Sequence, residues 1–156
     1  MTFEKLVAQM ITMIVTKRNI LKFSASFYDP LGWIVPVVIR ACVIFQSICS
    51  MKVQWDDPRS DDGVISEWRK FVAAVEVVKE VKINRYVFAS LPGKITSVKL
   101  YGFSDASNKV YAAVCYVKAS NKHGSIVRVI TSKEKVAPLK IKSIPRLELL
   151  GCLLLS

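Results

Sequence analysis

Two carboxylates, Asp105 and Glu148, stand at positions from which they could hold a divalent cation. Asp105 follows Val98–Ser104, whose alternating residues predict a strand. Glu148 falls in the opening turns of a predicted C-terminal helix, on a face that also carries Gly151 and Cys152. Because that face is otherwise small or apolar, we expect it to pack on the sheet. A carboxylate placed there needs a partner, and a metal ion is a natural one.

Both acids also have a structural interpretation. Ser104-Asp105-Ala106-Ser107 is good turn sequence, in which aspartate accepts backbone hydrogen bonds, and a glutamate near a helix N-terminus stabilises the helix dipole. Spacing alone favours this interpretation. The two alternatives differ in geometry, since a shared Mg²⁺ requires the carboxylates to approach within roughly 4–7 Å and a separation beyond about 10 Å excludes it.

The elements that must position these acids lie in the second half of the chain. Beyond Leu91-Pro92-Gly93 the hydrophobic period changes from helical to alternating. Strands are expected near 98–104, 110–118 and 125–131, and their short connections favour an antiparallel meander. A helix from about residue 144 should cover one face of this sheet.

Before residue 93 the apolar residues recur at helical spacing. Helices are expected from Thr16 to about Phe27, from Pro36 onward, and from Val64 to Val81. The predicted fold class is therefore α+β: a mostly helical N-terminal half, then a three-stranded antiparallel meander with one packed helix.

The charge balance limits the class of partner. The 156 residues carry a net charge of +11, and from Asp105 onward nine Lys and Arg face only three acids, the third being Glu134. Such an excess favours polyanions, nucleic acid first and anionic membrane surface second, although a merely basic surface explains it equally well. The candidate nucleic-acid contacts are Lys133, Lys140, Lys142 and Arg146.

The cysteines and the apolar segments indicate an intracellular protein, cytoplasmic or nuclear, and not a secreted one. All four cysteines lie in apolar runs without a C-x-x-C pair, and the single histidine, His123, makes a zinc site unfavourable. Leu6–Val15 lacks a small-residue cleavage site, so it is not typical of a signal peptide. Ile34–Met51 has the length of a membrane span, but Pro36, Arg40 and Gln46 interrupt it and favour a buried helix.

A series of motifs resembles the Pol polyprotein of BEL/Pao-type LTR retrotransposons. The motifs run in chain order from Thr16-Lys17-Arg18-Asn19, through Phe27-Tyr28-Asp29-Pro30-Leu31-Gly32-Trp33 with Pro36, Trp55-Asp56-Asp57-Pro58 and Trp68, to Tyr101-Gly102-Phe103-Ser104-Asp105-Ala106-Ser107 and the stretch Ser132-Lys133 through Ile144-Pro145-Arg146-Leu147-Glu148-Leu149. The ordered series is far more specific than any one motif.

The resemblance implies a division of the chain. Residues 16–93 are similar to the thumb and connection region of the reverse transcriptase, and residues 94–156 to the N-terminal part of a ribonuclease H-like domain; residues 1–15 match nothing that we can place. It also implies that Asp105 is the first catalytic aspartate and Glu148 the catalytic glutamate. In this family, two Mg²⁺ (or Mn²⁺) ions held by four carboxylates hydrolyse the RNA strand of RNA–DNA hybrids.

Because two of those carboxylates would come from later elements, we expect a truncated domain that is inactive alone, binds a cation weakly or not at all, and retains affinity for nucleic acid. The expected partners are an RNA–DNA hybrid or another polyanion and the remainder of a Pol polyprotein, with no small-molecule cofactor and no membrane.

Other function classes stay open. The region is also grouped under a Pao retrotransposon peptidase label, but Ala106 follows Asp105 where an aspartic protease needs Thr or Ser, and His123 alone makes no triad. A basic helical protein-interaction module, or a membrane-associated module built around Ile34–Met51, would have no catalysis.

Overall fold

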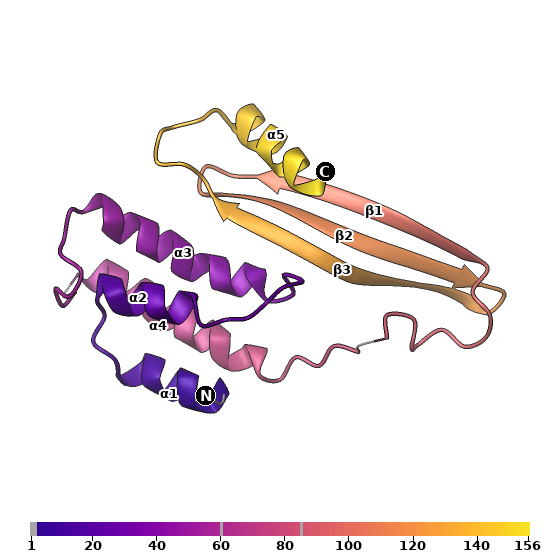
Figure 1. The fold of residues 1–156 in the computed structure, drawn as a ribbon, viewed down its shortest axis with the longest axis horizontal. Helices are drawn as coiled ribbons and strands as arrows, with labels where there is room; N and C mark the ends of the chain where they lie inside the picture. The colour runs from indigo at the N-terminus through magenta and orange to yellow at the C-terminus, as the bar shows by residue number, and fades with distance from the viewer. Residues whose placement is uncertain (1–2, 60, 85) are drawn as a thin grey trace. The chain divides into compact units, whose positions relative to one another are not determined.

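The computed structural model describes residues 3–59, 61–84 and 86–156, which form an α+β fold as predicted. The elements are α1 (Phe3–Thr12), α2 (Lys17–Ser24), α3 (Val35–Ser50), α4 (Asp62–Val78), β1 (Ser97–Ala106), β2 (Val110–Asn121), β3 (Gly124–Val136) and α5 (Ile144–Leu155) (Figure 1). They form two compact units: a helical unit, Met1–Asp29 with Pro36–Val81, and a sheet unit, Pro30–Val35 with Lys82–Ser156. The division by function at residue 93 stays a prediction.

The helical unit forms around Phe71 of α4, which is fully buried. Its ring lies 5.1 Å from Trp68 and 6.3 Å from Phe27, measured between centroids. The predicted cap at Thr16 is present, since its side chain accepts the Asn19 N–H at 3.1 Å. Helix α1, which the sequence left unassigned, joins this core through Met10, whose carbonyl accepts the Trp68 indole N–H at 3.3 Å.

Helix α3 covers most of the apolar segment that raised the question of a membrane span. Ala41, Ile44 and Ile48 are buried in the helical unit. In the described part of the chain, no helix combines the length and the apolar character needed to cross a membrane.

The sheet unit is the predicted meander. Its strand order is β1-β2-β3, and both pairs are antiparallel, with one bulge in β3 opposite Cys115 and Tyr116. Helix α5 packs on β1 and β2, where Leu147 is buried with Tyr111 and Ala137. The expectation of three adjacent antiparallel strands with a helix on one face is thus confirmed.

Part of the outer edge of β3 is occupied by Pro30–Val35, the short segment that leads into α3. The Ser132 N–H donates to the Leu31 carbonyl at 2.9 Å, and the Ser132 hydroxyl donates to the Gly32 carbonyl. The Trp33 indole N–H adds a bond of 3.1 Å to the Ile130 carbonyl. A segment far away in sequence therefore satisfies part of this edge, which would otherwise expose its hydrogen-bonding groups.

This contact depends on Gly32. Its φ of +72° disfavours any residue with a Cβ, and a Cβ there would overlap the Ser132 carbonyl oxygen. We expect Gly32→Ala to lower the free energy of unfolding by about 2 kcal/mol or more in urea denaturation. The control is Gly63→Ala near the start of α4, where φ is ordinary and a Cβ would meet only Asp61 Oδ1, at 3.1 Å. Equal effects of the two changes would contradict the role of Gly32.

Candidate carboxylate site at the end of β1

Helix α5 touches the sheet through the backbone of Gly151. A Cβ on Gly151 would lie 3.2 Å from the Ala112 carbonyl oxygen, 3.3 Å from Ser104 Cβ and 3.4 Å from the Asp105 carbonyl oxygen. One residue further on, Cys152 Sγ lies 3.3 Å from Ser104 Oγ. The absence of a side chain at Gly151 thus brings the middle of α5 against the strand end that carries Asp105.

Asp105 places its carboxylate at the open edge of β1. The Ser107 N–H donates to the Val110 carbonyl, so odd-numbered residues of β1 direct their backbone groups to β2 and even-numbered ones direct theirs outward. The outward N–H of Ala106 donates to Asp105 Oδ1 at 2.8 Å. The side chain therefore bends from the sheet face opposite α5 toward the edge.

Glu148 lies on α5 one turn before Gly151 and Cys152. Because Leu155 packs over Gly102 and Cys152 over Ser104, the turn that carries Glu148 continues toward Ala106. The side chain is exposed, and the ion pairs found among the described residues do not include it. The fold thus brings the two predicted acids to the same end of β1, while their sharing of a cation stays a prediction.

The binding of a cation by Asp105 and Glu148 stays a prediction, and it concerns one weakly held ion. The described residues contain no group of three or more His, Cys, Asp or Glu side chains able to hold a metal ion. Mg²⁺ keeps several waters and needs only one or two carboxylates, so a pair is sufficient for a single ion. Two-metal hydrolysis needs more ligands, and no step of it can be derived from this chain alone.

Glu134 is a neighbour of the site that the sequence did not reveal. The strand register pairs Asp105 with Ala112 and Ala112 with Glu134, so the two acids occupy one cross-strand row on the same face. Burial raises the pKa of the Glu134 carboxyl. In the sequence, the only signal for this cross-strand row was the length of the two hairpin connections, because those lengths determine the register of the strands.

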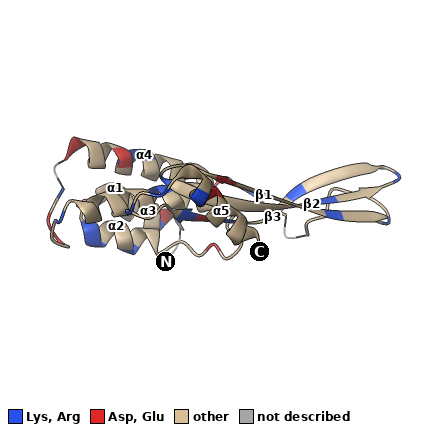
Figure 2. Ribbon diagram, turned by 90° about the horizontal axis from the view of Figure 1, so that it is seen from above, with Lys and Arg blue, Asp and Glu red and all other residues tan. Residues whose placement is uncertain are grey.

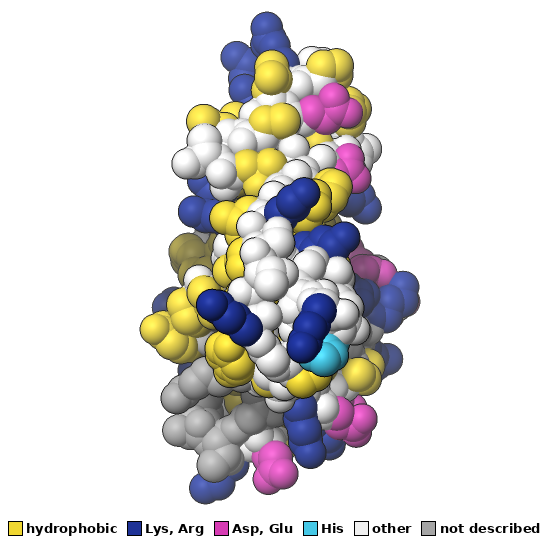
Figure 3. All heavy atoms as spheres, turned by 90° about the vertical axis from the view of Figure 1, so that its right-hand side faces the viewer, with side chains coloured by type: hydrophobic (Ala, Val, Ile, Leu, Met, Phe, Trp, Pro, Cys, Tyr) yellow, Lys and Arg dark blue, Asp and Glu magenta, His cyan; other side chains and the backbone are white. Residues whose placement is uncertain are grey.

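The predicted basic contacts gather at the same end of the sheet. Lys133 lies on β3 next to Ala113, Lys140 and Lys142 lie in the connection to α5, and Arg146 begins that helix. All four side chains are exposed. Figure 2 shows that basic positions also occur along the strands toward the end of the sheet away from α5, and Figure 3 looks onto that end, where basic side chains lie beside His123.

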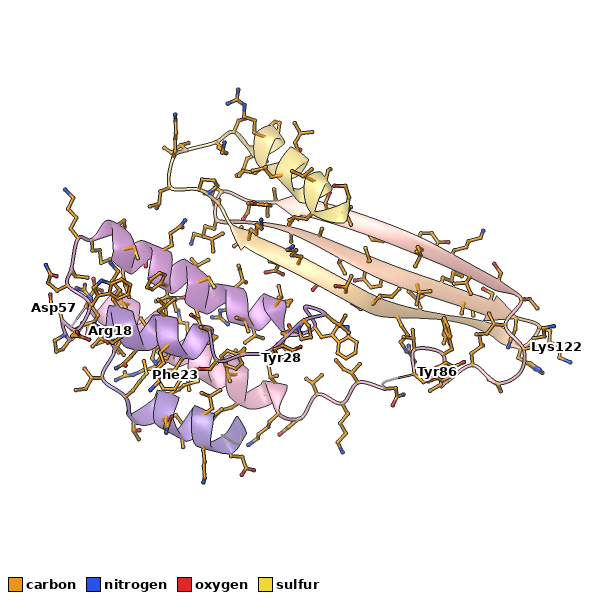
Figure 4. All side chains as sticks on the ribbon, in the orientation of Figure 1. Arg18, Phe23, Tyr28, Asp57, Tyr86 and Lys122 are labelled. Carbon is orange, nitrogen blue, oxygen red and sulfur yellow. The ribbon has the colours of Figure 1, made fainter. Side chains whose placement is uncertain are left out.

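In the helical unit, the structure joins two motifs that are distant in sequence. Arg18 forms a two-pronged pair with Asp56, at 2.7 and 3.0 Å, and its hydrogen bonds lower the pKa of that carboxyl. The Lys17 ammonium lies 4.7 Å from the centroid of the Trp55 ring. Figure 4 shows Arg18 beside the loop that carries Asp57.

A three-stranded antiparallel meander with a helix on one face is a ribonuclease H-like arrangement. The family model described as Pao retrotransposon-like RNaseH-like domain matches residues 16–156. The chain therefore belongs to this family, which confirms the resemblance to Pao-type retrotransposons. No curated protein matches the chain.

Paramagnetic Mn²⁺ tests the site directly. We expect it to broaden the backbone amide signals of Ala106 and Glu148 before those of the β2–β3 hairpin around His123, because the broadening falls steeply with distance. Asp105→Asn and Glu148→Gln should each weaken this effect several-fold, since each removes one anionic ligand.

Glu134→Gln is the matched control for that titration. It removes an acid from the same strand row and should leave the Mn²⁺ effect unchanged. If Glu134→Gln abolished the broadening and Glu148→Gln did not, the cation would sit on the sheet face opposite α5, and the predicted pair would be wrong.

Proposed function

We propose that this chain is the connection and ribonuclease H region of a Pao-type Pol polyprotein, and that it binds nucleic acid, RNA–DNA hybrid above all. The observation that carries the proposal is the contact of Gly151 with the Asp105 strand end, in a chain that the family model matches from residue 16 onward. It supports a position near the same end of β1 for the two carboxylates that the resemblance assigns to catalysis. The ancestral reaction would be two-metal hydrolysis of the RNA strand.

The electrostatics around the carboxylates support a phosphate-bearing ligand. Exposed Lys140, Lys142 and Arg146 flank the start of α5, and the whole chain carries a charge of +11. Each phosphate contact made by such a group releases counterions and strengthens binding at low salt. A divalent ion held between Asp105 and Glu148 would offset their repulsion of the phosphates. In the helical unit, Lys17 and Arg18 are further candidates for binding the phosphates of a nucleic-acid duplex.

The setting we propose is intracellular, cytoplasmic or nuclear, where nucleic acid is present. A second candidate function is protein interaction without catalysis. Its support is the exposed apolar surface of β1, where Leu100 is 71% and Phe103 58% exposed. If binding to an RNA–DNA hybrid did not depend on the salt concentration, this second function would be favoured.

The proposal predicts salt-dependent binding at the α5 end of the sheet. Lys140→Glu/Lys142→Glu should weaken binding to an RNA–DNA hybrid in fluorescence anisotropy. It should also reduce the slope of log K against log salt by about one for each phosphate that the variant no longer neutralises. The control with the same charge change is Lys94→Glu/Lys122→Glu, at the end of the sheet that carries the β2–β3 hairpin. A larger decrease in affinity for the control would place the nucleic acid there instead.

The proposal also predicts no hydrolysis by these 156 residues alone. With Mg²⁺ or Mn²⁺, a labelled RNA–DNA hybrid should be cut no faster than in buffer, because the resemblance assigns only two of the four carboxylates of the reaction, Asp105 and Glu148, to this chain. Metal-dependent cutting that Asp105→Asn abolishes would contradict this and show that the remaining acids suffice.

A further inference from the structure

The end of the sheet that carries the β2–β3 hairpin, the hairpin end, presents basic side chains far from the acids of the strands. Lys94, Lys122 and Arg128 are exposed there, and Figure 3 looks onto this end. Beyond residue 81 the sequence holds three acids, which are Asp105, Glu134 and Glu148. The two strand acids share the row of Ala112, which lies about 30 Å along β2 from the hairpin at the usual rise of a strand. That distance is several times the Debye length at physiological salt, so these acids do not neutralise the hairpin end.

One amide side chain fastens the segment before β1 to the hairpin. Asn121 Nδ2 donates to the Pro92 carbonyl at 2.6 Å, and Asn121 Oδ1 accepts the His123 N–H at 2.8 Å. The same side chain therefore fixes the backbone just before Lys94 and the turn that carries Lys122. Two ammonium groups that are distant in sequence are thus held at one corner of the sheet, which lowers the entropic cost of binding an anion between them.

Three further cations extend this basic corner along the strands. The Arg128 guanidinium donates to Ser90 Oγ at 3.2 Å, so it lies against the same segment that precedes β1. Lys99 and Lys118 stand directly opposite each other on β1 and β2. Like charges in such a cross-strand pair are destabilising, so an anion bound beside them would offset their repulsion. The hairpin end therefore suits a ligand with several negative charges in a row.

An exposed aromatic ring accompanies these charges. The Tyr86 side chain is 63% exposed, and its ring meets the Phe88 ring edge to face, with 5.8 Å between the centroids. Figure 4 shows Tyr86 and Lys122 at the same end of the sheet unit. The contact with Phe88 orients the tyrosine ring, while most of its surface stays available to a planar ligand. Basic groups that track a backbone and an aromatic ring for stacking are the two components of a surface for unpaired nucleotides.

We propose that the hairpin end binds single-stranded nucleic acid, with Lys94, Lys122 and Arg128 contacting phosphates and a base stacked on Tyr86. An unpaired strand suits this surface better than a duplex, because stacking on a tyrosine needs a free base face. Contacts of this kind do not depend on the base sequence. The site goes beyond the hybrid binding proposed above, since it lies at the other end of the sheet and takes a different form of nucleic acid.

Two lysine pairs test the location of this site. The probe is a labelled oligo(dT) of about ten nucleotides, within the usual site size for a single strand, followed by fluorescence anisotropy. Lys94→Glu/Lys122→Glu should raise its Kd at least about tenfold and reduce the slope of log K against log salt by about 0.7 for each lost phosphate contact. The control, Lys140→Glu/Lys142→Glu, makes the same charge change at the α5 end and should leave the Kd for oligo(dT) unchanged.

Substitution of the tyrosine tests the stacking separately from the charge. Tyr86→Ala should raise the Kd for oligo(dT) at least about fivefold, because a stacked base contributes about 1 kcal/mol or more. Tyr86→Phe keeps the ring and should bind as the wild-type chain does. The matched control is Tyr28→Ala in the helical unit, which removes a tyrosine that is 91% exposed and should not change the Kd.

Three outcomes would overturn the single-strand site. They are a wild-type chain that does not bind oligo(dT) at low salt, equal weakening by the two lysine pairs, and equal weakening by the two tyrosine-to-alanine changes. Lys94 and Lys122 lie outside the strands, so their replacement should leave the circular dichroism of the sheet unchanged. Failure here is distinguishable from failure of the proposed function, because hybrid binding that depends on Lys140 and Lys142 can hold when oligo(dT) does not bind, and the reverse.

Discussion

The sheet unit depends on the close approach of α5 at Gly151. The helix backbone lies so near the strands at this position that a Cβ on Gly151 would come within 3.2 Å of the Ala112 carbonyl oxygen and 3.4 Å of the Asp105 carbonyl oxygen. Any larger residue would have to lift the helix or shift the strands. The position of Glu148 relative to Asp105 is therefore set by a residue that has no functional group of its own.

The two edges of the sheet have different roles. Pro30–Val35 occupies part of the β3 edge, so the motif that leads into α3 is also a structural part of the sheet unit. The β1 edge stays open and holds the Asp105 carboxylate against the outward N–H of Ala106.

The helical unit explains why two distant motifs carry charged and aromatic residues. Arg18 and Asp56 pair, Lys17 lies over the Trp55 ring, and the Arg18 N–H donates to the Trp55 carbonyl at 3.0 Å. The exposed ion pair adds little stability by itself. Its consequence is geometric, since it holds the start of α2 beside the loop after α3.

The sequence by itself determined the element types, because helical and alternating periods are local properties of the chain. The three strands, the cap at Thr16 and the helix that carries Glu148 were predicted for this reason, and the ordered motifs identified the family. Tertiary structure decided the rest. Helix α1 is held by Met10 against Trp68, and the Asp105–Ala112–Glu134 row follows from strand register. The place of Pro30–Val35 on β3 depends on hydrogen bonds about a hundred residues apart in sequence. Such contacts leave no local pattern, because their partners meet only when the chain has folded.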